Sequence, residues 1–315
     1  MDCIIETKDL TKEFGSSIAV NSINMHVERG KIYGLLGKNG AGKTTTMCML
    51  LNLATPSSGD IFINGENIKD SKKYYSKIGS IIEVPGFYEN LSAFDNLKFI
   101  SKLRGNYDKS NIERILSVVS LTGAKNKKFK NFSLGMKQRL GIAAAIMHNP
   151  EILILDEPIN GLDPIGIIEI RTLLKRLVSE YGTTIIISSH ILSEIELIAD
   201  VIGVMKDGVL VEEISKEELK NKLDKYLEIE VSDLELATNL LEKIGFKKDF
   251  DFKIELLYDL VDSSDNIKKP GLIKLFSNIN LKSKINKLFV KEGIDIEKLV
   301  LCEESLEEYF TVLIN

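Results

Sequence analysis

The segment from Gly37 to Thr44 constrains the fold of this chain more than any other. It has the sequence Gly-Lys-Asn-Gly-Ala-Gly-Lys-Thr, and it lies between an apolar strand pattern at 32–36 and a helical pattern. Glycines let the backbone curl so that its N–H groups face a phosphate, and the dipole of the following helix adds to the attraction. This arrangement predicts an α/β core built around a nucleotide-phosphate site.

Within this loop, two side chains have specific expected roles. The Lys43 ammonium is expected to reach the β- and γ-phosphates, and the Thr44 hydroxyl is expected to ligate Mg²⁺. The loop alone indicates a nucleotide, because GTPases, kinases and transporters all share it. The other residues expected to bind the nucleotide lie in the loop or directly after it: Gly37, Asn39, Gly40, Ala41, Gly42 and Thr45.

Two acids follow the apolar run Ile152–Leu155. Successive side chains on a strand point to opposite faces, but the chain turns at a strand end, so Asp156 and Glu157 can reach one site. Asp156 is expected to hold Mg²⁺ through water, and Glu157 to polarise the attacking water as a general base. The alternative is that two exposed acids simply end a strand.

His190 follows a second apolar strand pattern, at 185–189. Open α/β sheets place ligands at the carboxyl ends of their strands. A neutral imidazole there can contact the γ-phosphate and hold the water and Glu157 in line. His26 and His148 have no comparable setting, and both are interpreted as structural.

Residues 132–139, Phe-Ser-Leu-Gly-Met-Lys-Gln-Arg, resemble the signature motif of ABC ATPases. Leu134 stands in the first glycine position of that motif, and Met136 stands in place of a glutamine. Residues 160–163 resemble the D-loop of the family, and Phe14 lies where the family has an aromatic that stacks on adenine. Six such elements follow one another in family order across residues 4–212. The resemblance implies that the nucleotide is ATP and that the chain hydrolyses it.

The resemblance also implies a stoichiometry. The chain has one phosphate loop and one signature motif, and in this family those two halves meet only between subunits. Ser133 and Gly135 are therefore expected to complete the ATP site of the opposite subunit, with Asp163 contributed by the D-loop. The implied assembly is a head-to-tail homodimer that ATP closes and hydrolysis reopens. The implied partner is a multi-span membrane permease.

Glu83 departs from the usual family pattern, in which most members carry glutamine. An acid there can still ligate Mg²⁺ and serve the catalytic site, but it adds a charge near the phosphates. The alternative is a tolerated isosteric replacement. The same glutamate occurs in ATPases of bacitracin and lantibiotic efflux or immunity transporters, and segments 82–91, 132–139, 189–196 and 304–310 also resemble that subgroup.

The chain has 315 residues, which suggests about two domains. Residues 214–315 contain 16 Lys and 21 acidic residues, which leaves 25 basic and 25 acidic residues for 1–213. We therefore expect a nucleotide-binding domain at 1–220, with a helical subdomain at about 86–150, and an accessory domain at 221–315. The predicted class is α/β: a P-loop NTPase core of the ABC ATPase type with a helical insertion, plus a small C-terminal α+β domain. The C-terminal pattern β-α-β-β-α-β plus a helix is the ferredoxin-like order.

Composition excludes several classes. A net charge of −5 argues against a nucleic-acid partner, because phosphate binding needs a basic face. The longest stretch without charged residues, 44–59, falls short of the ~20 apolar residues of a spanning helix. Three separated cysteines provide neither a disulfide framework nor a zinc site, and no signal peptide is visible. The chain is expected to be soluble and cytoplasmic, and peripheral on the inner face of the membrane through its permease.

Four functions compete. The leading one is the ATPase subunit of an exporter for bacitracin- or lantibiotic-like peptide antibiotics, giving resistance or immunity. The second keeps the ATPase but exports another drug or a lipid. The third is a non-transport ABC ATPase, against which stand the single cassette and the short interval between loop and signature. The fourth adds ligand sensing by the C-terminal domain. The alternative is that this domain only supports the dimer structurally.

Overall fold

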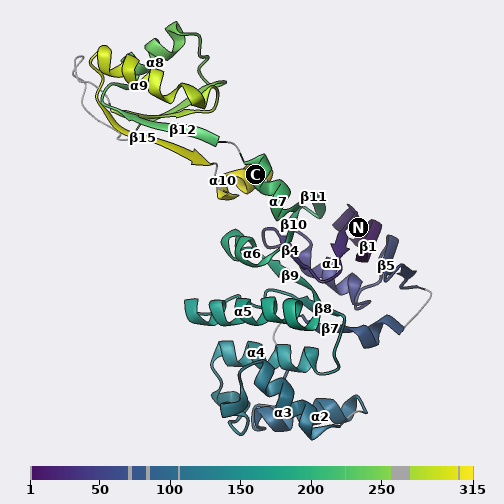
Figure 1. Cartoon of the computed structure of the whole chain (residues 1–315). Coiled ribbons are helices and arrows are strands. Elements are labelled where there is room, and N and C mark those ends of the chain that lie inside the picture. Colours follow the sequence, from purple (N-terminus) through teal and green to yellow (C-terminus); the bar gives the residue numbers. More distant parts are fainter. Residues whose placement is uncertain are drawn as a thin grey trace. The chain divides into compact units, whose positions relative to one another are not determined.

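The computed structural model describes residues 2–69, 73–82, 86–105, 107–223, 225–256, 270–303 and 306–314 (Figure 1). It divides into two compact units, Met1–Glu218 with Leu313–Asn315, and Leu219–Val312. Within the described residues, no helix has both the length and the apolar character that a membrane crossing requires.

The first unit is built on a six-stranded sheet with the order β11-β10-β4-β9-β8-β7. Neighbouring strands in it are parallel, except that the edge strand β11 is antiparallel to β10. Every residue of β4, β8 and β9 is buried. This agrees with their continuous apolar runs, which are typical of strands covered on both faces. The strands are β4 (Ile32–Leu36), β7 (Ile78–Ile81), β8 (Ile152–Leu155), β9 (Thr184–Ser189), β10 (Val201–Lys206) and β11 (Val209–Ser215).

Strands β10 and β11 form a hairpin, as the Asp-Gly pair between two apolar runs predicts. Its turn residues Asp207 and Gly208 have φ values of +48° and +82°. Both signs are those that a type I′ turn requires, and this turn matches the twist of the two strands that it joins.

A second, antiparallel sheet has the order β2-β1-β5-β6, with β3 also paired to β1. The sequence did not predict these strands, because the alternation of β1 is broken. Its pairing shifts register between Leu10 and Lys12, and Asp9 has a φ of +48°. The strands are β1 (Cys3–Phe14), β2 (Ser17–Ile23), β3 (His26–Glu28), β5 (Ser58–Ile63) and β6 (Glu66–Asn67).

Helix α1 (Lys43–Leu50) follows β4 directly. The helical pattern of the sequence extends to Leu53, but the helix ends at Leu50, because Asn52 takes a left-handed φ of +52°. Helices α2 (Ala93–Leu103), α3 (Lys109–Val118) and α4 (Leu134–Ile146) pack on one another and form the helical part of the unit (Figure 1). The remaining helices are α5 (Pro164–Tyr181), α6 (Leu192–Ile198) and α7 (Lys216–Lys222), with 3₁₀ turns at Lys73–Lys77, Thr122–Ala124 and Phe129–Asn131.

The second unit has the predicted order of elements. Its four strands form one antiparallel sheet in the order β13-β14-β12-β15, so each βαβ unit is split by a strand from the other. Leu227 and Ile229 of the sheet share a core with Leu241 and Phe289 of the helices. The elements are β12 (Lys225–Val231), α8 (Leu234–Lys243), β13 (Phe252–Leu256), β14 (Gly271–Leu275), a 3₁₀ turn (Ile279–Leu281), α9 (Lys282–Lys291), β15 (Ile296–Glu303) and α10 (Leu306–Ile314).

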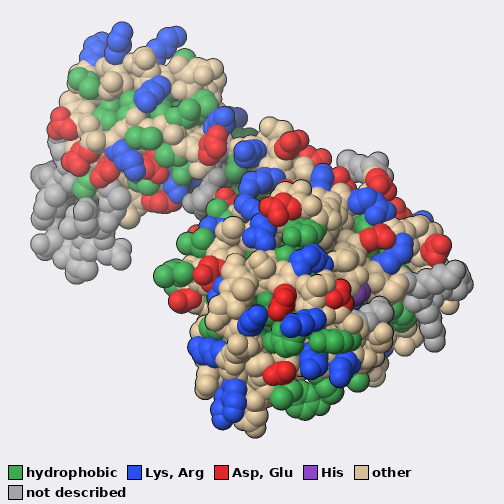
Figure 2. All heavy atoms as spheres, turned by 60° about the horizontal axis from the view of Figure 1, so that its bottom comes forward, with side chains coloured by type: hydrophobic (Ala, Val, Ile, Leu, Met, Phe, Trp, Pro, Cys, Tyr) green, Lys and Arg blue, Asp and Glu red, His purple; other side chains and the backbone are tan. Residues whose placement is uncertain are grey.

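Charged side chains of both signs are interspersed on the face shown in Figure 2.

His148 lies just beyond α4 and connects the helical part to the sheet. Its Nε2 is 3.1 Å from the Ile78 carbonyl, which can only accept, so Nε2 carries the hydrogen and Nδ1 accepts from Arg104. Burial, and secondly the Arg104 charge, lower the pKa of His148. Arg104 and His148 line a pocket together with Arg114 of α3 and Asp108, the residue that caps this helix.

This setting predicts an acid-sensitive first unit. As the pH falls through the ordinary histidine pKa of about 6.5, the unfolded chain takes up a proton that folded His148 resists. The free energy of unfolding therefore falls between about pH 6.5 and the lower folded pKa. In His148→Gln, the free energy of unfolding should change less with pH. Urea unfolding of both proteins at pH 7.5, 6.5 and 5.5 measures this dependence. Equal slopes in both proteins would contradict the assignment.

Candidate nucleotide site

The phosphate loop joins β4 to α1 at the carboxyl end of the central sheet. Gly40 and Gly42 have φ values of +85° and +101°, which favour glycine. A Cβ on Gly37 would lie 2.5 Å from the Met205 carbonyl oxygen. The Gly37 N–H donates to the Ser189 carbonyl at 3.3 Å, which ties the loop to the end of β9. Three glycines are therefore needed here for backbone conformation or for close approach.

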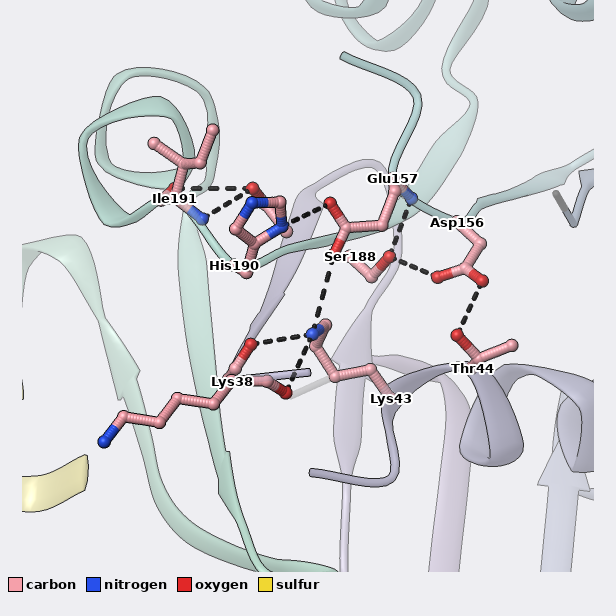
Figure 3. Close-up of polar contacts among 10 residues, drawn as sticks. Lys38, Lys43, Thr44, Asp156, Glu157, Ser188, His190 and Ile191 are labelled. Atoms are coloured by element: carbon pink, nitrogen blue, oxygen red, sulfur yellow. Dashed lines mark hydrogen bonds and ion pairs between the residues drawn. The ribbon is translucent and has the colours of Figure 1, made fainter. Parts of the chain in front are cut away.

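Lys43, the first residue of α1, lies at the centre of the loop with 5% of its surface exposed. Its Nζ donates to the carbonyls of Gly37 at 2.7 Å and Lys38 at 3.2 Å, and lies 3.5 Å from Glu157 Oε1 (Figure 3). A buried ammonium needs such compensation. The same nitrogen is the group best placed to bind phosphate oxygens that enter the loop.

Asp156 directly follows β8 and is 8% exposed. Its Oδ2 accepts from the Thr44 hydroxyl at 2.7 Å, and its Oδ1 accepts from the Ser188 hydroxyl at 2.5 Å. The structure thus brings together the carboxylate and the hydroxyl that the sequence predicted as Mg²⁺ ligands.

These oxygen donors fit Mg²⁺ and do not form an all-protein cage. Among the described residues, no cluster of three or more His, Cys, Asp or Glu could hold a metal ion. Mg²⁺ is usually bound by one or two protein oxygens while waters and substrate phosphates complete its shell. A threonine hydroxyl beside one carboxylate, next to a phosphate loop, matches that mode.

Glu157 turns away from the direction that a continued strand would give it. Its φ is +48°, and its backbone N–H donates to the Ser188 hydroxyl at 2.8 Å. Its Oε1 therefore faces Lys43, and its Oε2 lies 2.9 Å from His190 Nδ1 (Figure 3). Both consecutive acids reach the same site, as the sequence predicted, and His190 joins them from the end of β9.

The remaining predicted residues lie at the end of β1, in the loop, on α1 and at the starts of α4 and α5. Phe14 ends β1, is 56% exposed, and has the Lys12 ammonium 4.9 Å from its ring centroid. Ser133 caps α4 by accepting from the Met136 N–H, and Asp163 caps α5 by accepting from the Gly166 N–H. None of the described contacts joins either cap to the phosphate loop. Asn39 is exposed in the loop, Thr45 is half-buried on α1, and Gly135 lies in the first turn of α4.

Glu83 lies outside the described residues, so its metal and catalytic roles stay predictions.

The sequence predicts no role for Ser188, although its hydroxyl contacts both Asp156 and Glu157 in the structure. Ser188 and Ser189 end a strand rich in isoleucine, but nothing in that pattern distinguishes a serine that contacts the two acids.

Fold and site together define a P-loop nucleotide-binding enzyme. Residues 20–160 match the family model described as ABC transporter. The chain is 51% identical over its full length to a bacitracin transport ATP-binding protein of Enterococcus faecalis, 97% of which is covered. It is 46% identical to a lantibiotic transport ATP-binding protein of Streptococcus pyogenes, over 66% of this chain and 89% of that protein. A dimeric bacterial ABC transporter cassette matches 67% of this chain and 98% of its own, with a TM-score of 0.61 and 25% identity.

The chain therefore belongs to the ABC transporter ATP-binding proteins. It binds nucleotide and hydrolyses ATP, as members of this family do. The predicted family, fold class and enzymatic activity are confirmed.

Proposed function

We propose that this chain is the ATP-hydrolysing subunit of a membrane exporter for bacitracin- or lantibiotic-like peptides, and that it gives resistance or self-immunity. The observation that carries this proposal is the extent of the similarity. Identity to the Enterococcus faecalis bacitracin protein covers 100% of this chain, so it includes the second unit as well as the ATPase unit.

The geometry supports a division of labour among the site residues. Lys43 and the loop N–H groups bind the β- and γ-phosphates. Thr44 and Asp156 would hold Mg²⁺, which would screen the phosphate charge when bound. Lys43 exchanges its contact with Glu157 for phosphate oxygens as ATP enters. Glu157 keeps its contact with His190 and accepts the proton of the attacking water.

The second half of the site comes from another copy of the chain. The start of α4 has backbone N–H groups without helical partners, which together with the helix dipole suit a γ-phosphate. Ser133 and Gly135 lie at that start, Asp163 caps α5 beside it, and a Cβ on Gly161 would lie 3.3 Å from Leu134. Likeness to a dimeric cassette supports a head-to-tail homodimer that closes on ATP.

The partner is a multi-span permease, which places the ATPase on the cytoplasmic face of the membrane. Residues 1–220 form the nucleotide-binding domain. Residues 221–315 form an accessory domain that supports the dimer structurally. Compact units that divide at Glu218 and Leu219 support these bounds.

Deletion of the gene in its native host tests the cargo. Loss of the chain should increase sensitivity to bacitracin-like or lantibiotic peptides in a panel of antibiotics. Wild-type protein should restore resistance, and a Glu157→Gln variant expressed at the same level should not. Unchanged sensitivity to both peptide classes would reject this cargo while leaving the ATPase activity intact.

Glu83→Gln tests the departure from the family pattern. The change removes one negative charge near the phosphates at nearly constant size, so we expect a severalfold change in ATPase rate or in resistance. Glu89→Gln removes the same charge from an exposed position six residues later and serves as the matched control. Wild-type values for Glu83→Gln in both assays would identify the glutamate as a tolerated isosteric replacement.

A further inference from the structure

Ser188 is fully buried near the end of β9, between the two acids of the site (Figure 3). Its hydroxyl lies 2.5 Å from Asp156 Oδ1 and 2.8 Å from the backbone nitrogen of Glu157. Its hydroxyl is therefore hydrogen-bonded to both residues of the carboxylate pair. None of its described contacts is with Lys43 or His190.

The direction of these two hydrogen bonds is determined by chemistry. A backbone N–H can only donate and an ionised carboxylate can only accept, whereas a hydroxyl has one hydrogen to donate and lone pairs to accept. The Glu157 N–H therefore donates to Ser188, and Ser188 donates to Asp156. Because Thr44 donates to the other oxygen of Asp156, both carboxylate oxygens are held and the plane of the carboxylate is set.

The same serine stabilises an uncommon backbone conformation. Residues other than glycine rarely adopt a φ near the +48° of Glu157. This conformation turns the Glu157 carboxylate toward Lys43 and His190, whereas a continued strand would alternate its face relative to Asp156. Without the Ser188 hydroxyl, the Glu157 N–H loses its hydrogen-bond acceptor and the turn loses its support.

We infer that Ser188 is a positioning residue that couples the metal-binding acid to the general base. One hydroxyl orients the Asp156 carboxylate and holds the backbone turn that aims Glu157. The inference rests on the roles proposed above for these two acids. It requires that loss of the hydroxyl impair Mg²⁺ use and turnover together. ATP binding by the loop should not change, because Lys43 is held by Gly37 and Lys38 and does not contact Ser188.

Ser188→Ala in the full-length chain tests this coupling. Loss of a group that orients a metal ligand typically costs about 10- to 100-fold, and we expect kcat to fall by that factor. The Mg²⁺ concentration for half-maximal activity should rise, while the Kd for ATP measured without Mg²⁺ stays at the wild-type value. Ser188→Cys keeps the side-chain shape but bonds only weakly, so it should show the same defects. Ser189→Ala is the matched control, because the Ser189 hydroxyl bonds only the Ile191 backbone among described contacts.

Wild-type kcat and Mg²⁺ activation in Ser188→Ala or Ser188→Cys would overturn the inference. A loss of Mg²⁺-free ATP binding together with a lowered Tm in both variants would also overturn it, because the serine would then act through folding. Glu157→Gln measured in parallel separates a failure of the proposed general base from a failure of the role inferred for Ser188. Continued hydrolysis in that variant would reject the general-base role, whereas unaltered Mg²⁺ activation in Ser188→Ala rejects the role of Ser188 alone.

Discussion

Replacing Glu157 by glutamine is expected to lower kcat for ATP hydrolysis by about 10²- to 10⁴-fold, the usual contribution of a general base. An amide cannot take the proton of the attacking water. The backbone bond to Ser188 is retained, and Lys43 keeps its two carbonyl acceptors, so ATP should still bind. Phosphate release in a single turnover, measured beside ATP binding, separates these two effects.

Glu151→Gln provides the matched control for this variant. Glu151 directly precedes β8, at the end of the strand opposite Asp156, where it lies 2.9 Å from Lys77. Hydrogen bonding to Lys77 lowers the pKa of Glu151, so the change also removes a charged carboxylate next to β8, at its other end. Turnover should be retained. Hydrolysis at the wild-type rate in Glu157→Gln itself would move the general base to another group.

Lys43→Ala is expected to remove both ATP binding and turnover. Hydrogen bonds that involve a charged group contribute about 1.5–3 kcal/mol each, so losing two phosphate contacts weakens ATP binding by about 100-fold or more. The ammonium is almost fully buried in the loop, and no other described side-chain cation contacts the Gly37 carbonyl. Calorimetric titration with ATP, with and without Mg²⁺, measures the loss.

Lys38→Ala separates this effect from a general loss of charge in the loop. The Lys38 side chain is directed away from Lys43, and the carbonyl that accepts from Lys43 belongs to the backbone and survives the change (Figure 3). ATP binding should therefore remain far stronger than in Lys43→Ala. Equal losses in the two variants would show that the position of Lys43 is not what matters.

The central sheet was predictable because each of its buried strands is indicated by the apolar run within its own segment of the sequence. A run such as Ile152–Leu155 can be satisfied only as a strand covered on both faces, and the observed strand has the same bounds as the predicted one. The loop glycines and the Asp207 turn carry equally local signals. The antiparallel sheet was missed because the long strand Cys3–Phe14 contains bulges that disturb its alternation, and only its partners define it.

In the site, residue types and spacing predicted which groups meet but not how they are held. Lys43, Asp156 and His190 could be placed together because strand ends and a helix start converge at one edge of a parallel sheet. The left-handed φ of Glu157 and its bond to Ser188 depend on a neighbouring strand more than 30 residues away. No local pattern encodes such a contact, so a serine in an apolar strand gave no usable signal.

Sedimentation of Glu157→Gln with and without ATP tests most directly whether a second copy of the chain completes the ATP site. We expect single chains without nucleotide and a stable pair of chains with ATP and Mg²⁺. A second change, Ser133→Arg, should return the ATP-bound protein to single chains, because it blocks the start of α4. Saturation with ATP that leaves Glu157→Gln as single chains, or pairs that persist in Ser133→Arg, would contradict the composite site.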